Sequence, residues 1–253
     1  MSQYTRVDIV IPIFKTSFDK MEYFSVNYSL KMLSNKYKVV FVYPDKLDLC
    51  YYVDHFPGSF FSPFPAIFFE SHKNYNQLCY EVGFYSQFSK SSHILILQPD
   101  ALVVQQDLDK YCLSRYDFQG GPESHEYIYD IRGIPPFSKL DFLAPIRLHG
   151  CNGGLSLRRI SAFIEVLQEF KELTQFFRSY GRGIGEDIFF SLMGRVSDSF
   201  CVANEVAASK FALSYNFSQW IAFNRGVIPF GFHGWYNNEK DKEYVLSLLK
   251  DIT

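Results

Sequence analysis

Four short apolar runs in the first hundred residues place the strongest constraint on the fold. They occupy residues 7–14, 39–43, 66–69 and 94–97. Runs of this length without a polar alternation are typical of strands that are buried on both faces. Helical patterns over residues 17–33, with Ser17 as the expected cap, and over residues 75–88 separate them. The alternation predicts an α/β fold with a mixed, mostly parallel sheet flanked by helices.

The second half of the chain adds longer elements. Strands are expected near residues 116–122 and 155–157, and helices over residues 160–170, 186–195 and 240–251. Residues 123–147 show little periodicity and form a long connection, a kind of segment that often binds ligands. Because no internal repeat or clear linker interrupts the chain, we expect a single domain.

Composition and motifs exclude several classes of protein. The 253 residues are 47% hydrophobic and 19% aromatic, which excludes a disordered chain, and the net charge of -2 gives no general attraction to nucleic acid. The five cysteines form no CxxC pair, and no apolar run reaches the ~18–20 residues that cross a bilayer. The absence of a G-x-G-x-x-G or Walker motif disfavours dinucleotide oxidoreductases and P-loop nucleotidases. We expect a cytoplasmic protein without a transmembrane segment.

Two adjacent carboxylates, Glu186 and Asp187, follow the glycine-rich residues 181–185 and precede an apolar run. They are expected in the first turn of a helix, where the macrodipole would keep their pKa values low. A low-pKa carboxylate at the rim of a cleft can orient or deprotonate a hydroxyl group. The alternative interpretation is that the two residues only cap the helix.

Asp100 and His233 are candidate metal ligands. Asp100 directly follows the apolar run at residues 94–97, and ligands of parallel sheets bind beyond the carboxyl ends of the strands. Its carboxylate suits Mg²⁺ or Mn²⁺, although an ordinary strand-end turn also favours Asp. His233 lies in a glycine-rich segment and is either a metal ligand, a phosphate donor or a structural hydrogen-bonding residue.

A glycine pair, Gly153 and Gly154, would allow a ligand to approach the backbone closely. Arg158 and Arg159 follow at the expected junction of a strand with a helix. Their guanidinium groups are long enough to reach a phosphate, and a solvated surface pair is an equally compatible interpretation.

The order of these segments resembles a glycosyltransferase family that is largely catalogued as a domain of unknown function. The matching motifs are Gln-x-Asp at residue 98, Tyr-Asp-Phe-x-Gly-x-Pro at 116, Asn-Gly-Gly-Leu-Ser-Leu-Arg at 152, Glu-Asp-Ile-Phe-Phe at 186 and Pro-Phe-Gly-Phe-His-Gly-Trp at 229. That family is in turn similar to GT-A nucleotide-sugar transferases. The resemblance implies a GT-A-like (Rossmann-like) fold, with a nucleotide-binding part over about residues 1–105 and an acceptor-binding part over about residues 106–253.

The resemblance implies a donor site and its metal. Asp100 resembles the last acid of the Asp-x-Asp motif that holds Mn²⁺ or Mg²⁺ against the donor diphosphate, and His233 resembles the histidine that completes the metal ligands. Gln98 replaces the first acid, which puts metal dependence in doubt. Further donor contacts are expected from the segment beneath the donor sugar and from the end of the second strand, namely Asn152, Gly153, Gly154, Arg158, Tyr43 and Asp45.

The same resemblance implies roles on the acceptor side. Asp187 is the expected base of an inverting reaction, and Glu186 is expected to position the acceptor hydroxyl or the donor sugar. Trp235 is expected to stack on an acceptor sugar, and residues 181–185 are expected to close over the donor.

The resulting hypothesis is a glycosyltransferase that moves a sugar, favoured as a UDP-sugar, to a glycan hydroxyl. By analogy it would act in bacterial cell-surface polysaccharide assembly, with peripheral association at the inner face of the membrane. The alternative is a non-catalytic glycan- or nucleotide-sugar-binding protein on the same fold, which the glutamine at Gln98 favours. A metal-dependent hydrolase is a weaker third hypothesis, because one Asp and one His make a sparse ligand set.

Overall fold

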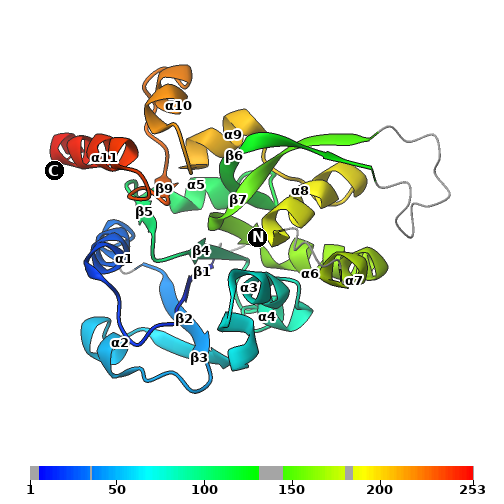
Figure 1. The fold of residues 1–253 in the computed structure, drawn as a ribbon, viewed down its shortest axis with the longest axis horizontal. Helices are drawn as coiled ribbons and strands as arrows, with labels where there is room; N and C mark the ends of the chain where they lie inside the picture. Colours follow the sequence, from blue (N-terminus) through cyan, green and yellow to red (C-terminus); the bar gives the residue numbers. More distant parts are fainter. Residues whose placement is uncertain (1–5, 35, 131–144, 180–184, 253) are drawn as a thin grey trace, which may run out of the picture.

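A six-stranded sheet with the order β3-β2-β1-β4-β7-β6 forms the centre of the protein (Figure 1). The structure is a computed structural model that describes residues 6–34, 36–130, 145–179 and 185–252. Four strands are mutually parallel, namely β1 (Val7–Pro12), β2 (Lys38–Pro44), β3 (Phe60–Phe64) and β4 (His93–Leu97). The strands β7 (Ile146–Arg159) and β6 (Phe118–Tyr129) extend the sheet in antiparallel fashion. The predicted α/β fold with a mixed, mostly parallel sheet is confirmed.

A small second sheet returns the C-terminal part of the chain to the end of β4. It has the order β5-β9-β8 and consists of β5 (Ala101–Val103), β9 (Gly231–His233) and β8 (Ala212–Leu213). The antiparallel pairing of β5 with β9 sets His233 opposite Ala101, the residue that follows Asp100. Residues far apart in the sequence therefore meet at the carboxyl end of β4.

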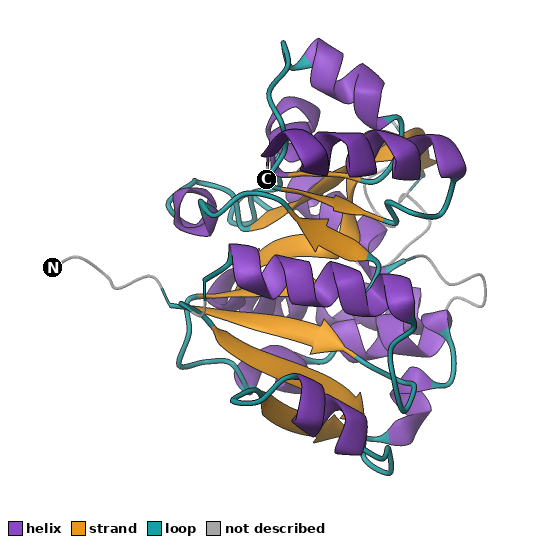
Figure 2. Ribbon diagram, turned by 90° about the vertical axis from the view of Figure 1, so that its left-hand side faces the viewer, coloured by secondary structure: helices purple, strands orange, loops and turns teal. Residues whose placement is uncertain are grey.

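Helices cover both faces of the central sheet (Figure 2). They are α1 (Lys20–Met32), α2 (Cys50–His55), η1 (Ala66–Phe69, a 3₁₀ helix), α3 (His72–Cys79), α4 (Val82–Ser86), α5 (Leu108–Cys112), α6 (Ile160–Glu169), α7 (Lys171–Ser179), α8 (Glu186–Val196), α9 (Glu205–Phe211), α10 (Phe217–Phe223) and α11 (Glu239–Ile252). Each helix in the described ranges is too short or too polar to cross a membrane.

The core is divided between the two faces of the sheet, because successive side chains of a strand point in opposite directions. In β1, Ile9 and Ile11 belong to a cluster with residues of α1 and α2, whereas Val10 belongs to a cluster that includes Phe163 of α6 and Phe190 of α8. All five side chains are fully buried. Burial of a side chain of this size contributes roughly 1.5–3 kcal/mol, so both helical layers are held firmly to the sheet.

One predicted strand is wrong. Residues Ala66–Phe69 form the 3₁₀ helix η1, and the third parallel strand is instead the preceding segment Phe60–Phe64. A run of only four apolar residues is too short for its periodicity to show whether it forms a strand or a helix. The true strand contains Ser62 and Pro63, which make its sequence look like a turn, but Pro is tolerated because β3 is an edge strand.

Three boundaries also differ from the sequence prediction. The helix expected over residues 75–88 is broken into α3 and α4, and β6 and β7 extend into the connection expected over residues 123–147. Residues 131–144 of that connection lie outside the described residues. The first helix begins after Asp19 rather than Ser17.

The start of α1 is a capping box. Asp19 Oδ1 accepts hydrogen bonds from the backbone N–H groups of Met21 and Glu22 at 2.8 and 2.9 Å, and Glu22 Oε2 accepts from the Asp19 N–H at 2.9 Å. These bonds satisfy helix N–H groups that have no partner within the helix.

Replacing Asp19 with Ala should lower the free energy of unfolding by about 1 kcal/mol, because the cap bonds are lost. Asp19→Asn, which keeps the accepting oxygen, should retain most of that stability. Urea unfolding monitored by circular dichroism measures both variants. Equal losses in the two variants would show that the cap oxygen is not what stabilises α1.

Candidate active site

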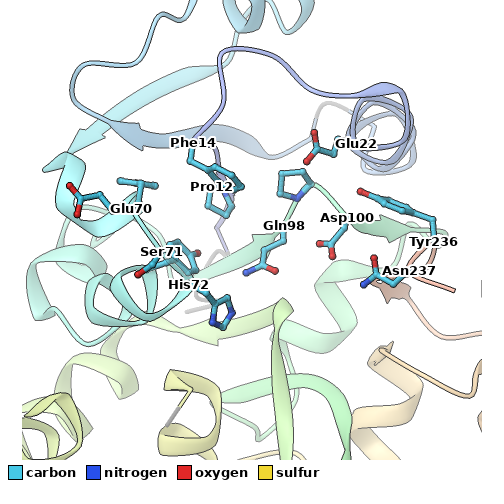
Figure 3. A pocket seen from close by; sticks show the side chains of 13 residues that line it. Pro12, Phe14, Glu22, Glu70, Ser71, His72, Gln98, Asp100, Tyr236 and Asn237 are labelled. Carbon is cyan, nitrogen blue, oxygen red and sulfur yellow. The ribbon is translucent and has the colours of Figure 1, made fainter. Parts of the chain in front are cut away.

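A pocket of about 450 Å³ opens beyond the carboxyl ends of β1 and β4 (Figure 3). Pro12 at the end of β1 and Gln98 and Asp100 after β4 form its centre. His72 at the start of α3 lies on one side, and Tyr236 after β9 lies on the other. This is the edge of a parallel sheet at which ligands bind in α/β folds.

Gln98 and Asp100 line this pocket, and the His233 side chain lies directly against both of them. His233 Nε2 lies 3.0 Å from Gln98 Oε1 and 3.3 Å from Asp100 Oδ1. Burial by itself would raise the pKa of Asp100, but the hydrogen bond and the charge of His233 lower that pKa below its ordinary value. Asp100 is therefore ionised at neutral pH, with its charge directed at the imidazole.

These three side chains are candidate ligands for a divalent cation, which would need its other ligands from elsewhere. Within the described part of the chain, no three His, Cys, Asp or Glu side chains are grouped so that they could hold a metal. Neighbouring ligands around an octahedral Mg²⁺, with bonds of ~2.0–2.1 Å, lie about 3 Å apart. The distances of 3.0 and 3.3 Å around His233 Nε2 are close to that separation, and they are also those of a hydrogen bond with Gln98 and an ion pair with Asp100. Water and a diphosphate commonly supply the remaining ligands of such an ion.

Gly153 and Gly154 of β7 connect this cluster to the acidic turn. A Cβ atom on Gly154 would lie 2.1 Å from His233 Nε2, and one on Gly153 would lie 2.7 Å from Glu186 Oε1. A side chain at Gly154 would therefore displace His233, and one at Gly153 would displace Glu186. The Gly153 N–H donates a hydrogen bond to Asp187 Oδ2 at 3.2 Å. Adjacent residues of one strand thus contact His233 and Asp187.

The environment of Asp187 corrects the low pKa expected from the sequence. Burial and the nearby charge of Glu123 raise the pKa of Asp187 above its ordinary value, although the backbone N–H groups of Ile188 and Gly153 oppose the increase. The first turn of α8 packs against β7 instead of facing water, and the cost of burying a charge there exceeds the favourable effect of the helix macrodipole.

Glu123 is a site residue that the sequence reasoning missed. Its Oε1 atom accepts a hydrogen bond from Asn152 Nδ2 at 3.1 Å, and Asn152 Oδ1 accepts one from the Gly154 N–H at 3.0 Å. Register shifts in the pairing of β6 with β7 flank Pro122, the residue before Glu123. Such irregularities often change the direction in which a side chain points. The turn residues Gly120, Gly121 and Pro122 were the available signal, because an acid directly after such a turn is a candidate for a bulge at a site.

Glu186 and Arg158 form a buried ion pair that anchors α8 to β7. Arg158 Nη2 lies 2.7 Å from Glu186 Oε1, Nη1 lies 3.1 Å from Oε2, and the two residues are only 1% and 4% exposed. Arg158 also donates to Tyr85 Oη and Ser156 Oγ, each at 3.0 Å. Burial raises the pKa of Glu186 and the Arg158 charge opposes the increase, which again differs from the low pKa expected.

Comparison with known proteins identifies the family and the fold. The family described as "Protein of unknown function (DUF5672)" matches residues 60–233. The chain belongs to this family. Among solved structures, the chain resembles a galactosyltransferase, LgtC, in complex with donor and acceptor sugar analogs, with a TM-score of 0.56 and 13% identity over 89% of this chain and 86% of that one. It also resembles mouse xyloside xylosyltransferase 1, with a TM-score of 0.56 and 12% identity over 90% of this chain and 97% of that one.

At these identities the likeness concerns the fold alone, and the fold of this DUF5672 chain is that of GT-A glycosyltransferases. No curated protein matches the sequence.

The structure corrects two expected ligand contacts in this DUF5672 chain. Trp235 is completely buried and its Nε1 donates to Ser25 Oγ at 2.9 Å, so its ring is not available to stack on a sugar. Arg158 does not extend toward a phosphate, because its guanidinium group is bound to Glu186 in the interior. In both cases a polar group seen in the sequence is satisfied inside the protein rather than by a ligand.

Two other predicted positions do not line the pocket. Tyr43 and Asp45 are at the end of β2, where the Tyr43 ring contacts Phe61 and the Asp45 N–H donates to the Phe64 carbonyl. Neither belongs to the described lining of the pocket. Of residues 181–185, which were expected to close over the donor, residues 181–184 lie outside the described residues. Glu22, His72, Tyr236 and Asn237 line the pocket instead and were not singled out from the sequence.

Replacing Glu186 with Ala should lower the free energy of unfolding by roughly 3–5 kcal/mol, because Arg158 would remain buried without a counter-charge. The matched control is Glu126→Ala, which breaks the exposed pair of Glu126 with Arg147. That change should cost less than about 1 kcal/mol. Chemical unfolding followed by tryptophan fluorescence compares the two variants, and similar losses in both would contradict an anchoring role of the buried pair.

Proposed function

We propose that this DUF5672 chain is a glycosyltransferase that transfers a sugar from a nucleotide-sugar donor to a glycan hydroxyl. One observation carries the proposal. Gln98 and Asp100 line the pocket beyond the parallel strands, His233 lies against both of them, and the adjacent glycines Gly153 and Gly154 connect them to Asp187. Candidate cation ligands, two glycines that allow close approach to the backbone and a half-buried carboxylate are thereby combined at one edge of the sheet.

The donor is assigned to the pocket at β1 and β4. Asp100 and His233, with Gln98 as an oxygen ligand, would hold Mn²⁺ or Mg²⁺, which stabilises the negative charge that develops on a leaving diphosphate. Most of the described residues that line this pocket precede residue 105, but Tyr236 and Asn237 line it from the C-terminal part. The proposed division assigns donor binding mainly to about residues 1–105 and acceptor binding to about residues 106–253.

Asp187 is assigned to the acceptor hydroxyl. In the transfer, the bond between the anomeric carbon and the diphosphate oxygen breaks, a bond from that carbon to the acceptor oxygen forms, and the hydroxyl proton passes to Asp187. A carboxylate with a raised pKa is a better proton acceptor than an ordinary one. This assignment favours inversion of the anomeric configuration, for which the configuration of the product measured by NMR is the direct check. Glu186 supports Asp187 from within the buried pair with Arg158.

The biological setting extends the same proposal by analogy. UDP is the proposed nucleotide of the donor, and cell-surface polysaccharide in a bacterium is the proposed product, with assembly at the inner face of the membrane. These assignments rest on the resemblance of the sequence motifs and on fold-level likeness, which by itself is compatible with many substrates.

Asp187→Asn should reduce turnover by about 10²–10⁴-fold, because the proton acceptor is lost, while donor binding is retained. Thermal-shift measurements with UDP-, GDP-, CMP- and dTDP-sugars, with and without Mn²⁺, report donor binding, since a bound ligand raises the midpoint by mass action. Product analysis with the donor that binds reports transfer.

Two outcomes would contradict parts of this proposal. If the wild-type protein binds a donor but transfers nothing to any acceptor, the protein is the non-catalytic binding protein that Gln98 favours. If donor binding does not depend on Mn²⁺, Asp100 and His233 do not hold a metal at the diphosphate.

The activity should fall as the pH decreases through the raised pKa of Asp187, because the base must be ionised. In Glu123→Gln the neighbouring negative charge is removed, so the pKa of Asp187 should decrease and the acidic limb of the kcat/KM profile should move to lower pH. The side-chain oxygen of Gln can still accept the Asn152 bond. Glu126→Gln, three residues along β6, is the control and should leave the limb in place. If the acidic limb of the kcat/KM profile does not move in Glu123→Gln, Asp187 is not the titrating base.

A further inference from the structure

A second pocket, of about 370 Å³, lies at α9 and α10, and no step of the proposed reaction uses it. In Figure 1, α9 lies next to β6 and α10 lies above α9 in the view. Its apolar part consists of Val206 and three rings, those of Tyr215, Trp220 and Phe223, and we call the pocket the aromatic groove. Its polar lining comes from Glu205, Asn216 and Gln219. The volume is within the range of ligand sites in proteins.

The rings of the aromatic groove are set at right angles to one another. The Tyr215 and Trp220 rings are 6.4 Å apart at 81°, and the Trp220 and Phe223 rings are 5.7 Å apart at 89°. Phe223 is 64% exposed, which is unusual for a large apolar ring. Rings at right angles present apolar faces in two directions. The C–H faces of a sugar could pack on these rings while its hydroxyl groups point to the polar lining.

The polar lining suits neutral hydroxyl groups. Asn216 has φ +49° and ψ +43°, and its side chain makes no capping bond to α10, so the amide is left for another partner. Gln219 adds a second amide with both donors and an acceptor. Glu205 is the acid of the groove and lies 3.2 Å from His149 Nδ1. The described lining contains no Lys or Arg, which disfavours a polyanionic ligand.

The aromatic groove is connected to the candidate active site through β6. Tyr215 Oη donates to the Glu123 carbonyl oxygen at 2.7 Å, and the Glu123 side chain accepts from Asn152 at 3.1 Å. Asn152 in turn binds the Gly154 N–H, directly beneath His233. Three hydrogen bonds therefore lead from the groove to the proposed site of transfer, on the side assigned to the acceptor.

We propose that the aromatic groove binds a neutral glycan, as a distal subsite for the acceptor chain whose terminal hydroxyl lies near Asp187. The assignment of the glycan as an acceptor rests on the proposed function. The binding itself depends on the three rings and the two amides alone. A subsite of this kind would bind the acceptor several sugar units away from the reacting hydroxyl.

The test compares the wild-type protein with Phe223→Ala and Gln219→Ala. Phe60→Ala is the matched control, because Phe60 is also an exposed ring, 55% accessible, and lies on β3 at the opposite edge of the sheet from β6. Saturation-transfer NMR measures binding of neutral oligosaccharides of two to four residues and of matched oligosaccharides that contain uronic acids. Circular dichroism confirms that each variant is folded.

The wild type should bind a neutral oligosaccharide, and Phe223→Ala should weaken the affinity by about tenfold, since burial of a phenyl ring is lost. Phe60→Ala should bind as the wild type does. In a transfer assay, Phe223→Ala should raise the KM for the acceptor and leave the donor KM unchanged. Unchanged affinity in Phe223→Ala, a preference for the uronic-acid series, or failure of the wild type to bind any neutral oligosaccharide would each overturn the proposal.

Donor binding separates this proposal from the proposed function. If neutral oligosaccharides bind through Phe223 but no nucleotide-sugar shifts the thermal midpoint, the aromatic groove is a glycan site on a protein that is not a transferase. If a donor binds and is used while Phe223→Ala leaves oligosaccharide affinity and acceptor KM unchanged, the transferase stands and the groove does not bind its acceptor.

Discussion

The buried ion pair between Arg158 and Glu186 is the interaction on which the arrangement of the site depends. Two charges in the interior are stabilised only when the geometry is good and the remaining donors are bonded. Here the guanidinium group binds both carboxylate oxygens, and Tyr85 and Ser156 accept further bonds. The pair joins β7 to the first turn of α8, so it fixes both the position and the rotation of that helix. Apolar packing alone would resist a rotation of α8 less strongly, because it is not directional.

Because α8 is held in this way, the position of its second residue, Asp187, is fixed. Asp187 meets the Gly153 N–H, and the following residue of β7, Gly154, lies against His233. The two carboxylates of the site consequently have different environments. The pKa of Asp100 is lowered by the imidazole of His233, whereas the pKa of Asp187 is raised by burial and by Glu123. When the pKa values of two carboxylates in one site shift in opposite directions, one carboxylate stays charged and the other can accept a proton.

The same β7 strand connects the catalytic region to the aromatic groove. Asn152 contacts Glu123 across β6, and the Glu123 carbonyl contacts Tyr215 at the start of α10. A donor pocket at the parallel strands and a glycan groove at the antiparallel edge would thus lie on either side of one strand. In the proposed function, the donor would bind at the parallel half of this sheet and the glycan at its antiparallel extension.

The sequence by itself determined the parallel strands β1, β2 and β4 and the helix that begins at Glu186. Local patterns suffice for these, since strand burial and helix starts are written within a few residues. Tertiary structure alone decided which charges are partnered. Arg158 and Trp235 look available in the sequence, yet their partners Glu186 and Ser25 are distant along the chain. Glu123 is brought to Asn152 by an irregular register of β6, and the pKa of Asp187 rises because α8 begins inside the protein. Such outcomes depend on burial and on long-range contacts, which no local pattern encodes.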